Sequence, residues 1–108
     1  MQSSVIAVLC TAPDAEVAER LARGVVEARL AACVNILPAV RSIYRWEGRV
    51  QDDAELLLVI KTRHEHFDAL RAWLTQHHPY DVPEVLGLPV SAVSAPYLSW
   101  LEGETARD

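Results

Sequence analysis

The sequence predicts an α+β domain with the element order βαββαβ and one added helix at its end. Some segments alternate apolar and polar residues with period two, which is typical of strands, whereas others repeat apolar residues at helical spacing. The 108 residues are 51% hydrophobic and 23% charged, which is enough apolar surface for one core. We therefore expect residues 1–108 to form a single domain.

A strand followed by a helix opens the chain. Val5 to Cys10 is a short apolar run, and the Thr11–Asp14 segment that follows supplies a proline and an aspartate suited to a helix start. Between Asp14 and Arg29 apolar residues recur at helical spacing, at Val17, Leu21, Val25 and Ala28. This pattern predicts one amphipathic helix.

A long β-hairpin is predicted next. Residues alternate with period two from Ala32 to Trp46, with a bend expected near Pro38. The segment Trp46–Arg49 contains a glycine that permits a chain reversal, and Val50–Thr62 is the expected return strand. Within it, Leu56–Ile60 is apolar without alternation, so we expect both of its faces to be covered.

The last part of the chain repeats the helix-then-strand order. Helical spacing over His64–His78 predicts a second helix, which must end before the proline that opens the Pro79–Pro83 loop. Val85–Val90 is read as a final strand, and Pro96–Glu102 as a short terminal helix. The order matches a ferredoxin-like sandwich, in which two helices cover one face of an antiparallel sheet.

The hairpin length predicts an oligomer. Strands of about twelve residues span roughly 40 Å, whereas a domain of this size has a radius of gyration of only ~13 Å, so part of the hairpin must protrude. Protruding apolar strands with open edges, and a sheet face without helices, both need another surface to cover them. We expect a second copy of the chain to do so.

Charge and hydropathy exclude several classes of function. The net charge is −5 and Lys61 is the only lysine, which argues against nucleic-acid binding. The cluster of Arg41, Arg45 and Arg49 is interpreted as a solvated strand face. The apolar stretches are too short for a membrane span, and no basic segment precedes the first of them, so a cytoplasmic location is predicted.

Metal ligation is the first candidate chemistry. The cysteine and histidine side chains that could bind a metal do not match any metal-site motif in their spacing. Both cysteines are expected to pack in the core. If a symmetry mate brought a second thiol close, however, Cys33 would become a soft ligand for Cu(I) or Zn. The side chains considered are Cys10, Cys33, His64, His66, His77 and His78.

A small-ligand cleft is the second candidate. Lys61 ends an apolar strand, and Tyr80 and Glu84 lie in a proline-rich loop whose rigid backbone suits the orientation of a ligand. An ordinary ion pair between Lys61 and Glu84 is the simpler interpretation. Tyr44 and Trp46 are either cleft walls or interface residues. No nucleophile elbow or phosphate loop is present, so no catalytic residue is assigned and an enzyme is not expected.

Several sequence blocks closely resemble the CutA divalent-cation tolerance family. The resemblance extends from about Val5 to Glu102. It rests on Cys10–Asp14, Arg29–Pro38, Ser42–Gly48, Ile60–Thr62, His78–Tyr80, Val82–Glu84 and the Tyr97-Leu98-x-Trp100-Leu101 ending.

This resemblance implies a compact trimer similar to the PII signalling proteins, with long hairpins interlocked between subunits, and a role in tolerance of copper and other divalent cations. No cofactor is implied besides copper or another divalent metal ion. The alternative is a PII-like sensor trimer that binds a small anionic ligand through Lys61. The resemblance places a shared inter-subunit pocket at Cys33, Asn35, Trp46, Lys61, Tyr80 and Glu84.

Overall fold

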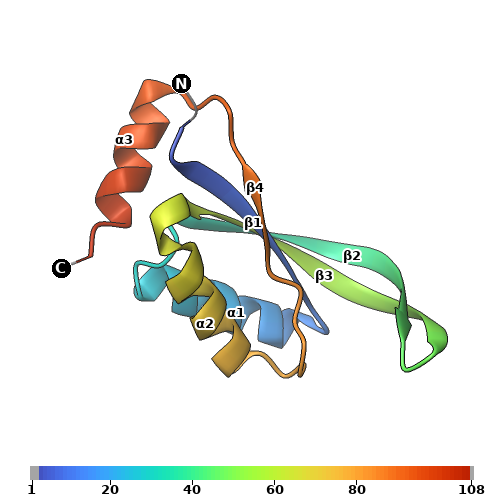
Figure 1. The fold of residues 1–108 in the computed structure, drawn as a ribbon. Helices are drawn as coiled ribbons and strands as arrows, with labels where there is room; N and C mark the ends of the chain where they lie inside the picture. The colour runs from blue at the N-terminus through green and yellow to red at the C-terminus, as the bar shows by residue number, and fades with distance from the viewer. Residues whose placement is uncertain (1–2, 108) are drawn as a thin grey trace.

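The computed structural model describes residues 3–107 and confirms the predicted α+β class and element order (Figure 1). A 3-10 turn, His64–His66, precedes α2. The elements are β1 (Val5–Ala12), α1 (Ala15–Glu27), β2 (Cys33–Trp46), β3 (Arg49–Arg63), α2 (Phe67–His77), β4 (Leu86–Pro89) and α3 (Ala95–Glu104).

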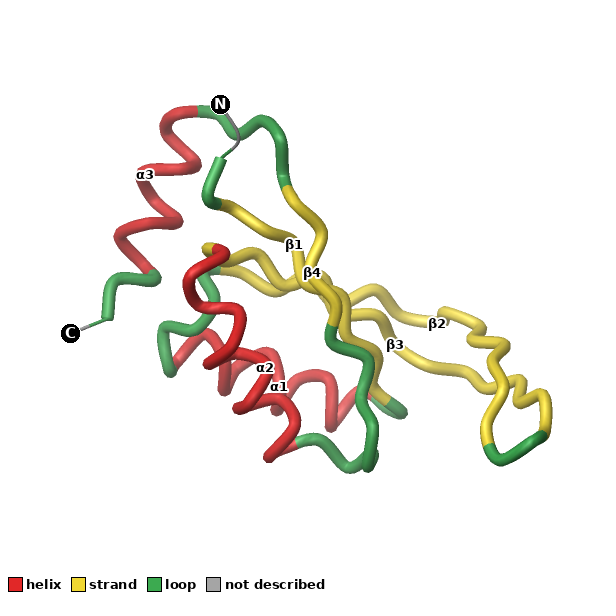
Figure 2. Tube along the Cα trace, viewed as in Figure 1, coloured by secondary structure: helices red, strands yellow, loops and turns green. Residues whose placement is uncertain are grey.

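The four strands form an antiparallel sheet in the order β2-β3-β1-β4 (Figure 1). This is the ferredoxin-like arrangement that the sequence predicted. Helices α1 and α2 lie together on one face of the sheet, and α3 lies apart from them beyond one end of it (Figure 2). The second layer therefore covers only one face of the sheet.

The main core lies between the sheet and the α1–α2 layer. Asp14 caps α1, because its carboxylate accepts a hydrogen bond from the Val17 amide at 2.9 Å. A smaller cluster joins α3 to the opposite side of the sheet through Val5, Ala32 and Leu101. The main core contains, among others, Val8, Cys10, Leu21, Val25, Leu58, Ile60, Leu70 and Leu74.

The hairpin is bent where the sequence predicted. The β2–β3 register shifts between Leu37 and Val40, and Ala39 takes a positive φ of 60°. At the tip, Glu47 and Gly48 have φ angles of 51° and 77°, and positive φ at both central residues matches the right-handed strand twist.

The second helix begins later than the sequence predicted. Residues 64–66 form a 3-10 turn instead of α-helix, and the side chain of His66, which precedes α2, accepts no capping hydrogen bond from the helix start. The amide of His64 instead donates to the Ser4 carbonyl at 2.7 Å, which ties this turn to the start of β1. The contact between distant segments, which local spacing cannot reveal, sets the helix start.

The β2–β3 hairpin extends well beyond the helices (Figure 2). The longest dimension of the molecule is 44 Å against 26 and 23 Å, and its radius of gyration of 14.4 Å exceeds the ~13 Å of a compact domain. Near the tip, Ile43 and Val50 are each 65% exposed. Among the described residues, no helix is long and apolar enough to cross a membrane.

The sheet face opposite α1 and α2 is called the open face here. Cross-strand register places Leu88, Ala7, Lys61 and Cys33 in one row on it, and Leu86, Leu9, Val59 and Asn35 in the next. The sequence predicted cover on both faces of Leu56–Ile60. One chain covers the helix face, where Leu58 and Ile60 are fully buried, but leaves Leu57 and Val59 only half-buried on the open face.

Candidate functional site

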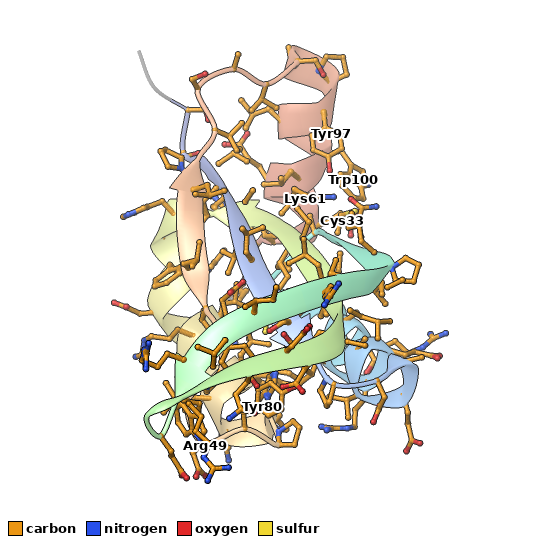
Figure 3. The ribbon with its side chains drawn as sticks, turned by 90° about the vertical axis from the view of Figure 1, so that its right-hand side faces the viewer. Cys33, Arg49, Lys61, Tyr80, Tyr97 and Trp100 are labelled. Carbon is orange, nitrogen blue, oxygen red and sulfur yellow. The ribbon has the colours of Figure 1, made fainter. Side chains whose placement is uncertain are left out.

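The predicted site residues fall into two groups within one chain. Cys33 and Lys61 lie near α3, whereas Tyr80 lies toward the other end of the molecule (Figure 3). Strand β3 connects the groups through Lys61 and Glu55, and these two positions of one extended strand are roughly 20 Å apart at ~3.3 Å per residue. A single chain therefore does not bring Lys61 together with Tyr80 and Glu84.

The first group is a small polar patch on the open face. Asn35 accepts a hydrogen bond from the Lys61 ammonium, and Cys33 is the cross-strand neighbour of Lys61. Lys61 forms no ion pair within residues 3–107, so the simpler interpretation of a Lys61–Glu84 pair is wrong for this chain. The ammonium thus keeps its charge available for another partner.

Helix α3 brings aromatic side chains to this patch. Tyr97 and Trp100 lie near Cys33 and Lys61 (Figure 3), and their ring centroids are 5.4 Å apart. Burial raises the pKa of Tyr97, and the adjacent Cys33 thiol raises it further. Sequence reasoning used Tyr97 only as part of the family ending, because nothing in the local pattern shows that α3 returns to β2.

The two cysteines occupy different environments. Cys10 is fully buried in the core, as predicted, whereas Cys33 is only partly buried on the open face, so its assignment to the core was wrong. Its strand position points it away from α1 and α2. Residues 3–107 contain no group of three His, Cys, Asp or Glu side chains able to hold a metal ion.

Three of the four histidines have structural partners: His66 and His77, and also His78, which belongs to the second group of site residues. His66 Nε2 lies 2.8 Å from the Thr105 carbonyl oxygen, and His77 Nδ1 lies 2.8 Å from that of Trp73. His77 also stacks on the Trp73 ring at a centroid distance of 3.9 Å. These contacts account for both side chains without a metal.

The second group surrounds a cavity of about 680 Å³ between the hairpin and the segment 80–84. We call it the acidic cavity. Tyr80 donates its hydroxyl hydrogen to Glu55 Oε2 at 2.8 Å, and Tyr44 donates to Asp53 Oδ2 at 2.5 Å. The lining comprises Thr11, Ser42, Ile43, Tyr44, Trp46, Glu55, Tyr80, Asp81, Val82, Pro83 and Glu84.

His78 fixes the wall of the acidic cavity. Its Nδ1 accepts a hydrogen bond from the Tyr80 amide at 3.1 Å, which leaves Nε2 to donate to the Thr11 carbonyl at 2.8 Å. The imidazole is largely buried and packs against the Tyr80 ring at a centroid distance of 4.6 Å. The segment after α2 is therefore tied to the end of β1.

Negative charge dominates the acidic cavity. Its lining includes three carboxyl side chains and no lysine or arginine. Burial, the hydrogen bond to Glu55 and the charge of that residue all raise the pKa of Tyr80. Burial also raises the pKa of the neighbouring Cys10 thiol to about 12, with further contributions from Glu84 and Glu55. Both groups therefore stay protonated at neutral pH.

Sequence reasoning did not select Glu55. It is only 7% exposed, although it belongs to a strand segment that precedes the apolar run Leu56–Ile60. The available signal was an acidic residue at the edge of an apolar run. A buried carboxylate requires a hydrogen-bond partner, and the Tyr80 hydroxyl is that partner.

Comparison with known proteins identifies the family. The model of the family described as CutA1 divalent ion tolerance protein matches residues 6–104, nearly the whole chain. The chain belongs to the CutA1 family. A divalent-cation tolerance protein CutA from Pectobacterium atrosepticum is 50% identical over 96 residues, covering 89% of this chain and 87% of the relative.

Solved CutA1 structures confirm the fold of this family member. The divalent cation tolerance protein of Thermus thermophilus superposes with a TM-score of 0.91 at 47% identity, covering 94% of this chain and 99% of the other. CutA1 from Oryza sativa gives a TM-score of 0.94 at 46% identity, covering 99% and 98% of the two chains.

Relatives in the CutA1 family are named for different compartments and differ in length. A rice relative named as chloroplastic is 49% identical over 100 residues, which are 93% of this chain but only 56% of that protein. The structure from Archaeoglobus fulgidus, described as a periplasmic divalent cation tolerance protein, matches with a TM-score of 0.92 at 33% identity over 94% of this chain and 99% of that one. Family membership therefore does not fix the compartment, and the cytoplasmic location remains a prediction.

Proposed function

We propose that this CutA1 family member is a divalent-cation tolerance protein that acts as a homotrimer and binds divalent or soft metal ions, including copper, where subunits meet. The half-covered sheet carries the proposal. On the open face, Leu86 and Leu88 are 44% and 45% exposed, and Leu37 on the neighbouring hairpin is 42% exposed. An apolar face of this kind favours contact with another protein surface.

The metal-binding part of the proposal rests on Cys33. Its thiol lies on the same open face, within reach of an interface, and thiols are preferred ligands of Cu(I) and Zn. Because residues 3–107 hold no complete ligand group, the missing donors would come from neighbouring subunits. A cytoplasmic location fits this role, since a reducing compartment keeps Cys33 as a thiol. The proposal includes no catalytic step.

Native mass spectrometry of protein purified without chelators or an affinity tag tests both parts. We expect trimers that carry metal in multiples of three, and a Cys33→Ser variant that remains trimeric but loses the metal. Cys10→Ala is the matched control, because Cys10 is buried away from the open face and its loss should leave the metal in place. A monomeric mass would contradict the assembly, and a Cys33→Ser trimer that retains metal would contradict the site.

The free charge of Lys61 favours a second candidate function, that of a PII-like sensor trimer. Lys61 has an amide partner in Asn35 but no carboxylate partner among the described residues, so it could bind a small anion. The predicted walls Tyr80 and Trp46 would then belong to a neighbouring subunit. Lys61→Ala should abolish retention of an anionic ligand and spare metal binding; an unchanged ligand mass in this variant would reject the sensor.

A further inference from the structure

Helix α3 has only a small apolar contact with the rest of the chain. Within residues 95–104 Leu101 alone is buried, and it packs with Val5 and Ala32 in the smaller of the two clusters. Most other side chains of α3 are exposed. Because so little apolar surface anchors the helix, polar bonds must decide where it lies on the sheet.

Thr105, which follows α3, is the centre of these polar bonds. It is fully buried, although the residues on either side of it are exposed. Its hydroxyl donates to the Leu101 carbonyl at 2.7 Å and accepts from Arg63 Nε at 3.0 Å. Its carbonyl oxygen accepts from Arg63 Nη2 at 3.1 Å and lies 2.8 Å from His66 Nε2. The end of α3 is therefore bonded to the end of β3 and to the turn that follows it.

Arg63 is the group that joins α3 to the sheet. It ends β3 two positions after Lys61, so it lies on the open face in the next row, and its side chain is only 19% exposed. Two of its guanidinium nitrogens bond Thr105, and the third lies 2.8 Å from Glu65 Oε1. A lysine could not make this planar set of bonds. Positive charge at the C-terminal end of α3 also complements the helix dipole.

The other contacts of this helix end are weaker or fewer. Arg29 donates to the Glu104 carbonyl at 3.2 Å, but its side chain is 54% exposed, where water competes for the same groups. His66 reaches the Thr105 carbonyl and not the hydroxyl. Among the described residues, only the Arg63 side chain bonds both groups of Thr105.

The position of Thr105 determines the position of Tyr97. Tyr97 lies beside Cys33 on the open face (Figure 3), close enough for the thiol to contribute to its raised pKa. It is eight positions before Thr105, which is about 12 Å along an α-helix. Because two turns of helix move as one body, a bond that fixes Thr105 also fixes Tyr97 over Cys33.

We propose that Arg63 is a positioning residue for the Cys33 thiol, because its bonds to Thr105 hold α3 where Tyr97 covers that thiol. This inference rests on the metal-binding role proposed for Cys33 and adds how access to the thiol is set. Without Arg63, α3 would keep its apolar contact through Leu101 but would move more freely over the open face. Cys33 would then be more accessible.

Alkylation of Cys33 by iodoacetamide in the full-length protein, with EDTA present, tests the proposal without any metal. Intact-protein mass spectrometry gives the rate, and Cys33→Ser gives the background from buried Cys10. We expect Arg63→Gln and Thr105→Val each to raise the rate by about tenfold, since losing a charge-assisted hydrogen bond shifts the opening of α3 by that order.

Two variants serve as controls in the same assay. Thr105→Ser keeps the hydroxyl that bonds Arg63 and should retain the wild-type alkylation rate. Arg23→Gln removes an arginine from an exposed ion pair on α1 and should also leave the rate unchanged. Wild-type rates in folded Arg63→Gln and Thr105→Val would overturn the proposal, as would equal acceleration by Arg23→Gln. If Arg63→Gln does not fold, the comparison of Thr105→Val with Thr105→Ser decides.

A double variant separates positioning from a general loosening of the protein. Tyr97→Ala should accelerate alkylation by itself, and adding Arg63→Gln should change nothing further, because both substitutions remove the same cover. Accelerations that multiply would overturn the proposal, as would a Tyr97→Ala variant with the wild-type rate. These outcomes do not depend on metal. A Cys33→Ser trimer that retains metal would reject the metal site alone, whereas an unchanged alkylation rate would reject the positioning role alone.

Discussion

At the scale of single residues, surroundings give the two cysteines different chemistry. Cys10 is fully buried beside Glu55 and Glu84, and burial is the main reason why its pKa rises from 9.0 to about 12. Because the thiolate is the reactive form of cysteine, Cys10 is inert at neutral pH. Cys33 is only partly buried, on the open face.

The raised pKa of Cys10 predicts a loss of stability at alkaline pH. Below about pH 9 the thiol is protonated in both the folded and the unfolded chain and contributes nothing to pH dependence. Between about pH 9 and 12 the unfolded chain releases this proton while the folded chain retains it. The free energy of unfolding should therefore fall as pH rises, by up to about 1.4 kcal/mol per unit.

Urea denaturation of the wild type and Cys10→Ala at several pH values from about 8 to 11 measures this effect. Other alkaline groups titrate in both proteins, so the difference between the two curves isolates Cys10. We expect Cys10→Ala to be less stable at pH 8, because it leaves a small cavity, but to lose less stability on going to high pH. Parallel pH profiles would show that the Cys10 pKa is not raised in the folded state.

At the scale of elements, α1 and α2 approach each other at Gly24. A Cβ added at Gly24 would lie 2.3 Å from Cη2 of Trp73, which is far inside van der Waals contact. The Trp73 ring is also stacked against His77, which restrains its movement. Glycine in a helix interior normally costs stability, and the close approach of the two helices explains its presence here.

Gly24→Ala should therefore destabilise the protein although alanine favours helix. We expect the free energy of unfolding to fall by about 1–3 kcal/mol, which is the usual cost of overpacking. Gly103→Ala in α3 is the matched control, since nothing lies within 4 Å of its added Cβ, and it should stabilise the protein by roughly 0.5–1 kcal/mol. Equal stability of the two variants in urea denaturation would show that Trp73 moves aside freely.

The elements were predictable because alternation and helical spacing are local properties. Strands β2 and β3, the bend at Pro38 and the amphipathic face of α1 all follow from residues close together in the chain. The burial of Glu55 was not predictable, because it depends on Tyr80, which is 25 positions away in the sequence. The sequence blocks also picked out Lys61 and Tyr80. They did not show that the two lie apart, because Tyr80 contacts β3 at Glu55 and not at Lys61.

At the scale of the whole molecule, the sheet has one covered face and one open face. The helices bury Leu58 and Ile60 on one side, while Leu86 and Leu88 remain almost half exposed on the other. The hairpin that gives the molecule its 44 Å length adds Ile43 and Val50 as exposed apolar groups. Both features place apolar surface where a second chain would cover it.

If neighbouring copies cover the open face, folding and assembly are coupled. The thermal midpoint should then rise by several degrees for each tenfold increase in protein concentration, because dilution favours the separated, unfolded chains.

A charge introduced on the open face distinguishes stability that depends on assembly from the stability of the single chain. Leu86→Glu should yield monomers with a lower midpoint that no longer depends on concentration, as measured by sedimentation equilibrium and thermal scans. Val26→Glu is the matched control, because Val26 is 40% exposed, close to the 44% of Leu86, but lies on α1. If the two variants behave alike, or if the wild-type midpoint is independent of concentration, the open face is not an interface. Its exposed leucines would then need another partner.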